Sequence, residues 1–180
     1  MSDAPDPAEE HACAPDKTLP PQTRALIEDF ASQRRLAIVG VSASGKKFGN
    51  MMLKELRKRG YEVVAVHPTA TEIAGEACYP DLKALEGRID GAVICVPASA
   101  GVAVLDDAAE MGLKRIWLQQ GSQSDELLAH AAALGLEPVH GRCILMYAQP
   151  VGSLHGVHRF FAGLFGGLWP KEQVKARPAP

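Results

Sequence analysis

A short loop rich in glycine, serine and lysine is the part of this sequence best suited to bind an anion. In the stretch LAIVGVSASGKKFGN, residues 36–50, an apolar run ends at a glycine and small residues lead on to Lys46 and Lys47. Where a strand turns into a helix, free backbone N–H groups and the helix dipole favour a phosphate. Small side chains let a ligand reach the backbone, and Ser42 or Ser44 can add a hydroxyl donor. We therefore predict a phosphate-binding loop, with an ordinary turn carrying two solvated lysines as the alternative.

The spacing of the glycines separates this loop from two common nucleotide motifs. Gly40, Gly45 and Gly49 follow the pattern G-x4-G-x3-G rather than the dinucleotide pattern G-x-G-x-x-G. The P-loop pattern is incomplete, because Lys47 stands where a Ser or Thr would bind magnesium. An NAD site needs an acidic residue at the end of the second strand, where this chain has His67. An arginine that would suit NADP is also missing there, so an NAD(P)-type dinucleotide is the alternative ligand.

The cysteines are candidates for a reactive nucleophile. The sequence has no H-E-x-x-H helix and no G-x-S-x-G elbow. Cys95 lies within a predicted buried strand and Cys78 precedes a predicted short helix, so both are expected to be structural thiols. Cys143 follows a glycine and an arginine after the last predicted strand and could approach a bound thiol or thioester. We expect a binding module without catalysis of its own, with a thioester-processing enzyme that uses Cys143 as the alternative.

A second group of residues has the spacing of a metal site. His140, Cys143, His155 and His158 form the pattern H-x2-C-x11-H-x2-H. Two histidines three residues apart on a helix can share a zinc ion. That helix would also have to fold back onto residues 140–143. We therefore favour a last helix that merely carries two histidines, and we predict no metal site.

Strand-like and helix-like segments alternate through most of the chain. Apolar runs predict strands over residues 36–41, 61–68, 90–97, 113–121 and 136–141. Helical patterns cover residues 49–60, 98–112 and 124–135, and a short helix is expected over 79–85. Alternation of this kind predicts an α/β fold, a Rossmann-like doubly wound parallel sheet in a single domain over residues 23–150.

Individual residues refine the expected helices. Met52, Leu53 and Leu56 share one face of the first helix, and Gly60 stands at its expected C-cap. In the second helix Val102, Leu105 and Ala109 are expected to face inward. In the third helix Ser124 is the expected N-cap and Gly135 the expected C-cap.

The expected sheet also indicates where a ligand would bind. Ligands of such sheets lie beyond the carboxyl ends of the strands, at the point where the strand order reverses. The candidate site is therefore the set of strand exits at residues 40–47, 67–69, 96–99 and 119–121.

Composition excludes several classes of partner. The chain has 180 residues, of which 47% are hydrophobic and 22% charged, and its formal net charge is -2. That charge gives no indication of a nucleic-acid surface, and no apolar run approaches the roughly 20 residues of a membrane span. The four cysteines are widely spaced without a C-x-x-C pair, and the acidic N-terminus is unlike a signal peptide. We expect a cytoplasmic protein that neither binds nucleic acid nor spans a membrane.

The two ends of the chain differ from the predicted domain. Residues 1–22 and 171–180 are expected to be disordered tails. Residues 151–170 predict a helix whose apolar face carries Leu154, Val157, Phe161, Leu164, Phe165 and Leu168. Such a stripe either packs on the domain or forms a homodimer, and we favour the homodimer. Binding to a membrane surface is a rival interpretation, but only Arg159 and Lys171 flank the helix.

Taken in order, six segments resemble a known family. They are AIVGVSAS, GYEVVAVHP, EIAGEACYPDLKAL, DGAVICVPA, KRIWLQQG and GRCILMYAQPV. No single one is diagnostic, but the ordered set resembles the CoA-binding-domain proteins over residues 23–165. These are small stand-alone relatives of the CoA-binding domain in the succinyl-CoA synthetase alpha subunit. The resemblance implies a Rossmann-like fold that binds CoA or an acyl-CoA.

The resemblance also implies roles for residues at the strand exits. The diphosphate would be lined by Gly40, Val41, Ser42, Ala43 and Ser44. The adenosine side would be lined by Val96, Pro97 and Ala98, and we add Gln120 and Gly121 from the next strand exit. The family usually has Asn-Pro, often followed by a basic residue, where this chain has His67, Pro68 and Thr69. The 3′-phosphate would then be held by Lys46, Lys47 or a protonated His67.

Overall fold

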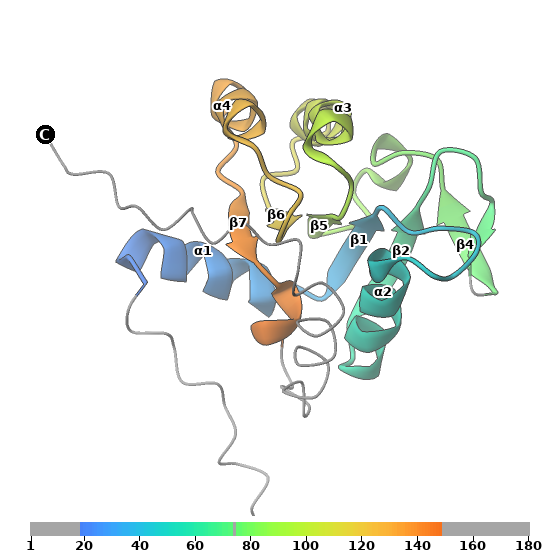
Figure 1. Cartoon of the computed structure of the whole chain (residues 1–180). Helices are drawn as coiled ribbons and strands as arrows, with labels where there is room; N and C mark the ends of the chain where they lie inside the picture. The colour runs from blue at the N-terminus through green and yellow to red at the C-terminus, as the bar shows by residue number, and fades with distance from the viewer. Residues whose placement is uncertain (1–18, 74, 149–180) are drawn as a thin grey trace, which may run out of the picture.

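A seven-stranded sheet forms the centre of the molecule, which the computed structural model describes over residues 19–73 and 75–148. The strand order is β3-β4-β2-β1-β5-β6-β7, and every neighbouring pair is parallel except β3 and β4. Helices α1 and α2 cover one face of the sheet, and α3 and α4 cover the other (Figure 1). The predicted Rossmann-like α/β fold is therefore confirmed.

The elements follow one another along the chain as a regular alternation. The strands are β1 (Arg35–Val39), β2 (Glu62–Val66), β3 (Glu72–Ile73), β4 (Glu76–Tyr79), β5 (Gly91–Ile94), β6 (Ile116–Gln119) and β7 (Val139–Arg142). The helices are α1 (Pro21–Ser32), α2 (Phe48–Lys58), α3 (Ala98–Glu110) and α4 (Asp125–Ala133), with 3-10 turns η1 (Lys83–Leu85) and η2 (Ile144–Met146).

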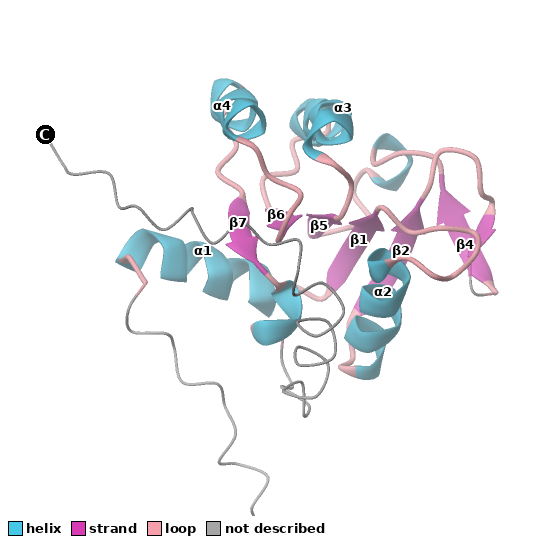
Figure 2. Cartoon of the chain, viewed as in Figure 1, coloured by secondary structure: helices cyan, strands magenta, loops and turns pink. Residues whose placement is uncertain are grey.

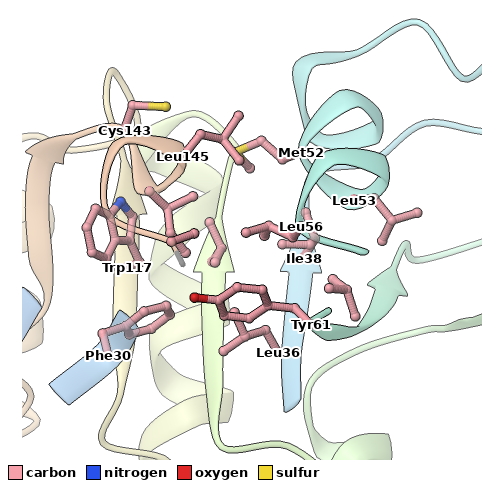
Figure 3. Close-up of a cluster of buried hydrophobic side chains, with 14 of the residues drawn as sticks. Phe30, Leu36, Ile38, Met52, Leu53, Leu56, Tyr61, Trp117, Cys143 and Leu145 are labelled. Carbon is pink, nitrogen blue, oxygen red and sulfur yellow. The ribbon is translucent and has the colours of Figure 1, made fainter. Parts of the chain in front are cut away.

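Two apolar clusters, one on each face, hold the helices to the sheet. Strand β1 serves both, because Leu36 and Ile38 belong to the cluster under α1 and α2, while Ala37 and Val39 belong to the opposite cluster. Figure 3 shows the first cluster, in which Trp117 is fully buried and packs edge-on against Phe30 at 5.4 Å. Burial on both faces explains why the strands are almost continuously apolar.

A buried arginine at the end of α2 anchors that helix to the last part of the domain. The Arg59 guanidinium donates hydrogen bonds to the carbonyl oxygens of Leu145 (2.8 Å) and Ala148 (3.2 Å). It also donates to Glu55, one turn earlier in α2. Both ends of α2 are thus held, this one by the segment around η2 and the other by the loop after β1.

The predicted helix faces are confirmed in α2 and corrected in α3. Met52, Leu53 and Leu56 are buried as expected. In α3 the prediction that Val102 faces inward is wrong, because Val102 is 37% exposed. Gly101 faces α4 instead, and a Cβ there would lie 2.9 Å from the side chain of Leu127. Because the two helices approach closely at this glycine, the buried face of α3 is shifted by one residue from the predicted face.

Two regions of structure go beyond the sequence-based expectations. Helix α1 begins at Pro21, inside the predicted tail, and Leu19 before it is buried. The predicted short helix over 79–85 is only the 3-10 turn η1, and the segment before it forms the edge strands β3 and β4. The predicted helix over 151–170 and the tail over 171–180 lie outside the described residues. No helix of the described part is long and apolar enough to cross a membrane.

Candidate functional site

Four strand exits lie side by side along one edge of the sheet. Strands β2, β1, β5 and β6 are consecutive neighbours and run parallel, so their carboxyl ends share this edge. Figure 2 shows the loops that leave β1, β5 and β6 for the helices that follow. The chain goes from β1 to β2 on one side and later enters β5 on the other side. The strand order therefore reverses between β1 and β5, where sheets of this class bind ligands.

The two strands at this switch point approach so closely that only glycine fits in the loop. Gly40 directly follows β1 and has φ +105°. A Cβ at Gly40 would lie 2.7 Å from both the carbonyl carbon and the carbonyl oxygen of Cys95, which directly follows β5. Backbone contact at this distance requires the absence of a side chain.

A second glycine brings α2 onto the same loop. A Cβ at Gly49 would lie 2.6 Å from the Gly40 carbonyl oxygen and 3.1 Å from the Val41 nitrogen. The first turn of α2 therefore rests directly on the loop backbone. Gly45 differs, because a Cβ there would meet nothing within 4 Å and its role is the turn itself, at φ +72°.

Asn50 is a residue of this site that sequence reasoning missed. Its side chain is 2% exposed, and its Oδ1 accepts hydrogen bonds from the Ser42 backbone N–H (2.9 Å) and hydroxyl (3.2 Å). Its Nδ2 donates to the Ser42 carbonyl oxygen at 2.9 Å. The Ser42 hydroxyl also lies 3.0 Å from that of Ser44. The available signal was a polar residue one turn before Leu53, on the apolar face of the predicted helix.

The tip of the loop presents unpaired donors and positive charge. Residues 43–47 are exposed. Within the described ranges, nothing accepts a hydrogen bond from the backbone N–H groups of Ala43, Ser44, Lys46 or Lys47. Lys47 is the N-cap of α2, no side chain caps this helix, and its first turn has no acidic residue. The helix dipole and two ammonium groups therefore favour an anion at the tip.

The turn after β2 is closed by its own histidine. Nδ1 of His67 accepts hydrogen bonds from the backbone N–H groups of Ala70 (3.1 Å) and Thr69 (3.3 Å). Nδ1 therefore carries no hydrogen, and the ring proton sits on Nε2. Pro68 and Thr69 are exposed.

The exits of β5 and β6 place the remaining predicted residues along the same edge of the sheet as the loop. Val96 and Ala98 pack partly against the apolar cluster under α3, and Pro97 is the exposed N-cap of α3. The Gln120 N–H donates to the Arg142 carbonyl oxygen at 3.2 Å. Gly121 has φ +91°, and its N–H donates to the Gln123 side chain at 3.1 Å. These exits add apolar and backbone groups but no carboxylate.

All three described thiols have a raised pKa. Burial raises the pKa of Cys143, although hydrogen bonding from Gln119 and the charge of Arg59 oppose the shift. Burial also raises the pKa of Cys95 and of Cys78. A nucleophilic cysteine needs its pKa lowered toward neutrality. The environment of Cys143 therefore speaks against the thioester-processing alternative.

The metal pattern falls only partly within the described residues. His140 is exposed and Cys143 is buried, while His155 and His158 lie outside the described residues. Over residues 19–73 and 75–148, no group of three or more His, Cys, Asp or Glu side chains is arranged to hold a metal ion.

Comparison with known proteins gives consistent matches. Residues 34–149 match a family described as CoA binding domain. The chain is 26% identical over 124 residues to the uncharacterized protein YneT of Bacillus subtilis, covering 69% of this chain and 92% of YneT. It is 28% identical over 121 residues to an ADP-forming acetate–CoA ligase of Archaeoglobus fulgidus, covering 62% of this chain but only 18% of the ligase. A conserved hypothetical protein from Pyrococcus furiosus has a similar structure, with a TM-score of 0.59 and 39% identity, covering 62% of this chain and 96% of that one.

Proposed function

The chain belongs to the CoA-binding domain family, and on that premise we propose that it binds coenzyme A or an acyl-CoA through the loop between β1 and α2. The observation that carries the proposal is the tip of this loop. It combines unpaired backbone donors, an uncapped helix N-terminus and two exposed lysines at the switch point of the sheet. An anionic ligand with a diphosphate would satisfy all three features.

The proposed diphosphate site uses a narrower set of donors than the sequence suggested. The Ser42 N–H is already bonded to Asn50. The N–H groups of Ala43 and Ser44 are the donors available to the ligand, with Gly40 and Val41 forming the floor of the loop. Lys46 and Lys47 supply the charge for the diphosphate or the 3′-phosphate.

The adenosine would lie on the β5 side of the loop. Val96, Pro97 and Ala98 offer partly exposed apolar surface and directly follow Cys95, whose backbone lies against Gly40. Gln120 and Gly121 extend that surface at the next strand exit. An adenine ring on apolar side chains with a few backbone groups nearby is a common arrangement in small-molecule sites.

The role we propose is binding without catalysis, as a cytoplasmic sensor, carrier or regulatory module for CoA or an acyl-CoA. The raised thiol pKa values support this choice over a thioester-processing enzyme. His67 after β2, in place of an acidic residue, supports CoA over an NAD(P)-type dinucleotide.

Isothermal titration calorimetry with CoA, acetyl-CoA, NAD and NADP tests the proposal. CoA or acetyl-CoA is expected to bind more tightly than either dinucleotide. Tighter binding of NAD or NADP than of both CoA species would reject it. Thioester hydrolysis that disappears in Cys143→Ala would reject the non-catalytic role.

We further propose that the protein forms a homodimer through the apolar stripe of residues 151–170. The support is the stripe itself, because an apolar patch of this length is typical of an interface between proteins. Light scattering should give a dimer for the full chain and a monomer for the double variant Phe161→Asp/Phe165→Asp. A monomeric full chain at high micromolar concentration would contradict the proposal.

A further inference from the structure

We propose that Asn50 is the positioning residue of the CoA site, which fixes the loop between β1 and α2 in the conformation that receives the diphosphate. The inference rests on the proposed function and adds a residue to it. Asn50 itself is buried and does not touch the ligand in this proposal; it acts through Ser42.

One side-chain amide satisfies both backbone groups of a single loop residue. The Ser42 N–H donates to Oδ1 of Asn50, and Nδ2 of Asn50 donates to the Ser42 carbonyl oxygen, each at 2.9 Å. Since Asn50 is 2% exposed, its removal would leave two backbone groups without their partners in a buried position. The pairing links a residue of the first turn of α2 to a residue eight positions earlier in the loop.

The same bonds decide which loop groups face a ligand. The Ser42 carbonyl oxygen accepts from Asn50 and also from the Gly45 N–H at 3.0 Å, which closes the turn over residues 42–45. The Ser42 carbonyl oxygen would repel a phosphate, but it already accepts these two hydrogen bonds. The following N–H groups, of Ala43 and Ser44, are left for an anion. Asn50 thus holds the Ser42 carbonyl oxygen in a hydrogen bond and leaves the N–H groups of Ala43 and Ser44 available to the ligand.

Asparagine is the side chain that fits this task. It carries an acceptor and a donor on one planar group, which the N–H and carbonyl of one residue require. An aspartate would lack the donor, and a serine would be too short to reach both backbone groups. The neighbouring Gly49 brings the helix within this reach, because a Cβ there would lie 2.6 Å from the Gly40 carbonyl oxygen.

The test compares CoA affinity in Asn50→Ala and in Leu53→Ala, a buried apolar position one turn later on the same helix. Without the amide, the loop populates its binding conformation less often, and the apparent Kd rises by the same factor. We expect about a tenfold or greater rise in the CoA Kd for Asn50→Ala. We expect about a twofold change or less for Leu53→Ala at a temperature where both variants are folded.

Amide hydrogen exchange of the ligand-free protein gives an independent readout. Exchange of the Ser42 N–H should accelerate in Asn50→Ala and remain slow in Leu53→Ala. If Asn50→Ala does not fold, Asn50→Ser keeps a polar side chain that cannot span both groups, and the same rise in Kd is expected.

The outcomes separate this inference from the proposed function. Failure of the unchanged protein to bind CoA would reject both. CoA binding by the unchanged protein, with equal affinity in the Asn50 variant that folds, would reject the positioning role alone. An equal loss of affinity in Leu53→Ala would also reject it, because the effect would then follow general loosening of α2.

Discussion

Two strand-to-helix turns on the same edge of the sheet have opposite electrostatics. At the turn from β6 into α4, the Ser124 hydroxyl caps the helix by accepting a hydrogen bond from the Leu127 N–H at 3.2 Å. Asp125 and Glu126 occupy the first turn of that helix. At the turn from β1 into α2, the N-cap is Lys47, no side chain caps the helix, and the first turn has no acidic residue.

The difference shows that the N–H groups at a helix N-terminus can be satisfied by the helix's own side chains or can remain available to a ligand. Carboxylates near the first N–H groups stabilise a helix, and cations there do not. Helix α4 carries its own anions, so a phosphate at that turn would be repelled. Helix α2 carries cations where anions belong, and an anionic ligand would compensate for them. The four predictions below test this contrast, from the largest expected effect to the smallest.

The largest effect is expected from Gly40→Ala, which should disrupt the turn from β1 into α2, called the ligand turn below. The new Cβ would meet the Cys95 backbone at 2.7 Å, and φ is +105°. We expect a loss of about 3 kcal/mol or more in the free energy of unfolding, from the positive φ and the overlap together. CoA binding should disappear with it. Urea denaturation and calorimetry measure the two losses.

Gly45→Ala is the matched control for this substitution. Its φ is also positive, at +72°, but a Cβ would meet nothing within 4 Å. The cost should be limited to about 1–2 kcal/mol for the left-handed conformation. Equal costs at the two glycines would show that the close approach of β1 and β5 is not what requires Gly40.

The second prediction concerns the charge of the ligand turn. The double variant Lys46→Ala/Lys47→Ala should weaken CoA binding by about 1–3 kcal/mol, the range for hydrogen bonds to charged groups. Its free energy of unfolding should stay within about 0.5 kcal/mol, because both side chains are exposed.

A matched charge change away from the turn provides the control. Lys54→Ala/Lys114→Ala removes the same charge from exposed positions outside the loop, so its CoA affinity should stay close to that of the unchanged protein. Calorimetry at low and high salt should show the difference between the two double variants shrinking as salt is added. Equal affinities at low salt would mean that the loop lysines do not contact the phosphates.

Much of the fold was predictable because its determinants are local. Runs of apolar residues indicated the parallel strands. The cap at Ser124 and the apolar face of α2 could be inferred from side-chain type and spacing. The location of the site followed from the same pattern, since parallel strands bring their exits to one edge. The acid-free, lysine-bearing turn at the start of α2 was also visible in the sequence.

The remaining features depend on tertiary contacts that no local pattern encodes. The role of Asn50 requires α2 to lie against the loop, which depends on Gly49. Val102 is exposed because Gly101 packs against Leu127 of another helix. The strands β3 and β4 are short and largely exposed, so they lack the apolar alternation by which a strand is detected.

The third prediction concerns the turn from β6 into α4, which is capped by its own side chain. Ser124→Ala removes the cap of α4 and should lower the free energy of unfolding by about 1 kcal/mol, the usual cost of losing a helix N-cap. CoA affinity should not change, because this turn has no place for a phosphate. The midpoint of urea unfolding and a calorimetric titration measure the two quantities. A marked loss of CoA affinity would mean that a phosphate of the ligand also binds at the N-terminus of α4.

The smallest effect concerns the pH dependence of that same turn. The pKa of Glu126 is lowered, first by a hydrogen bond from its own backbone N–H and then by one from the Ser124 hydroxyl. A lowered folded-state pKa favours the ionised form, so this contribution is complete above the ordinary glutamate pKa of about 4.3 and is lost as pH falls through the lower folded value. The unchanged protein should therefore exceed Glu126→Gln in stability at pH 7, and the difference should shrink as the pH is lowered toward about 3. Urea unfolding of both proteins across this range measures it, with CoA affinity at neutral pH expected to be equal. A stability difference that does not vary with pH would show that the carboxylate does not act as the anion of the α4 N-terminus, and the contrast with α2 would then rest on Ser124 and Asp125 alone.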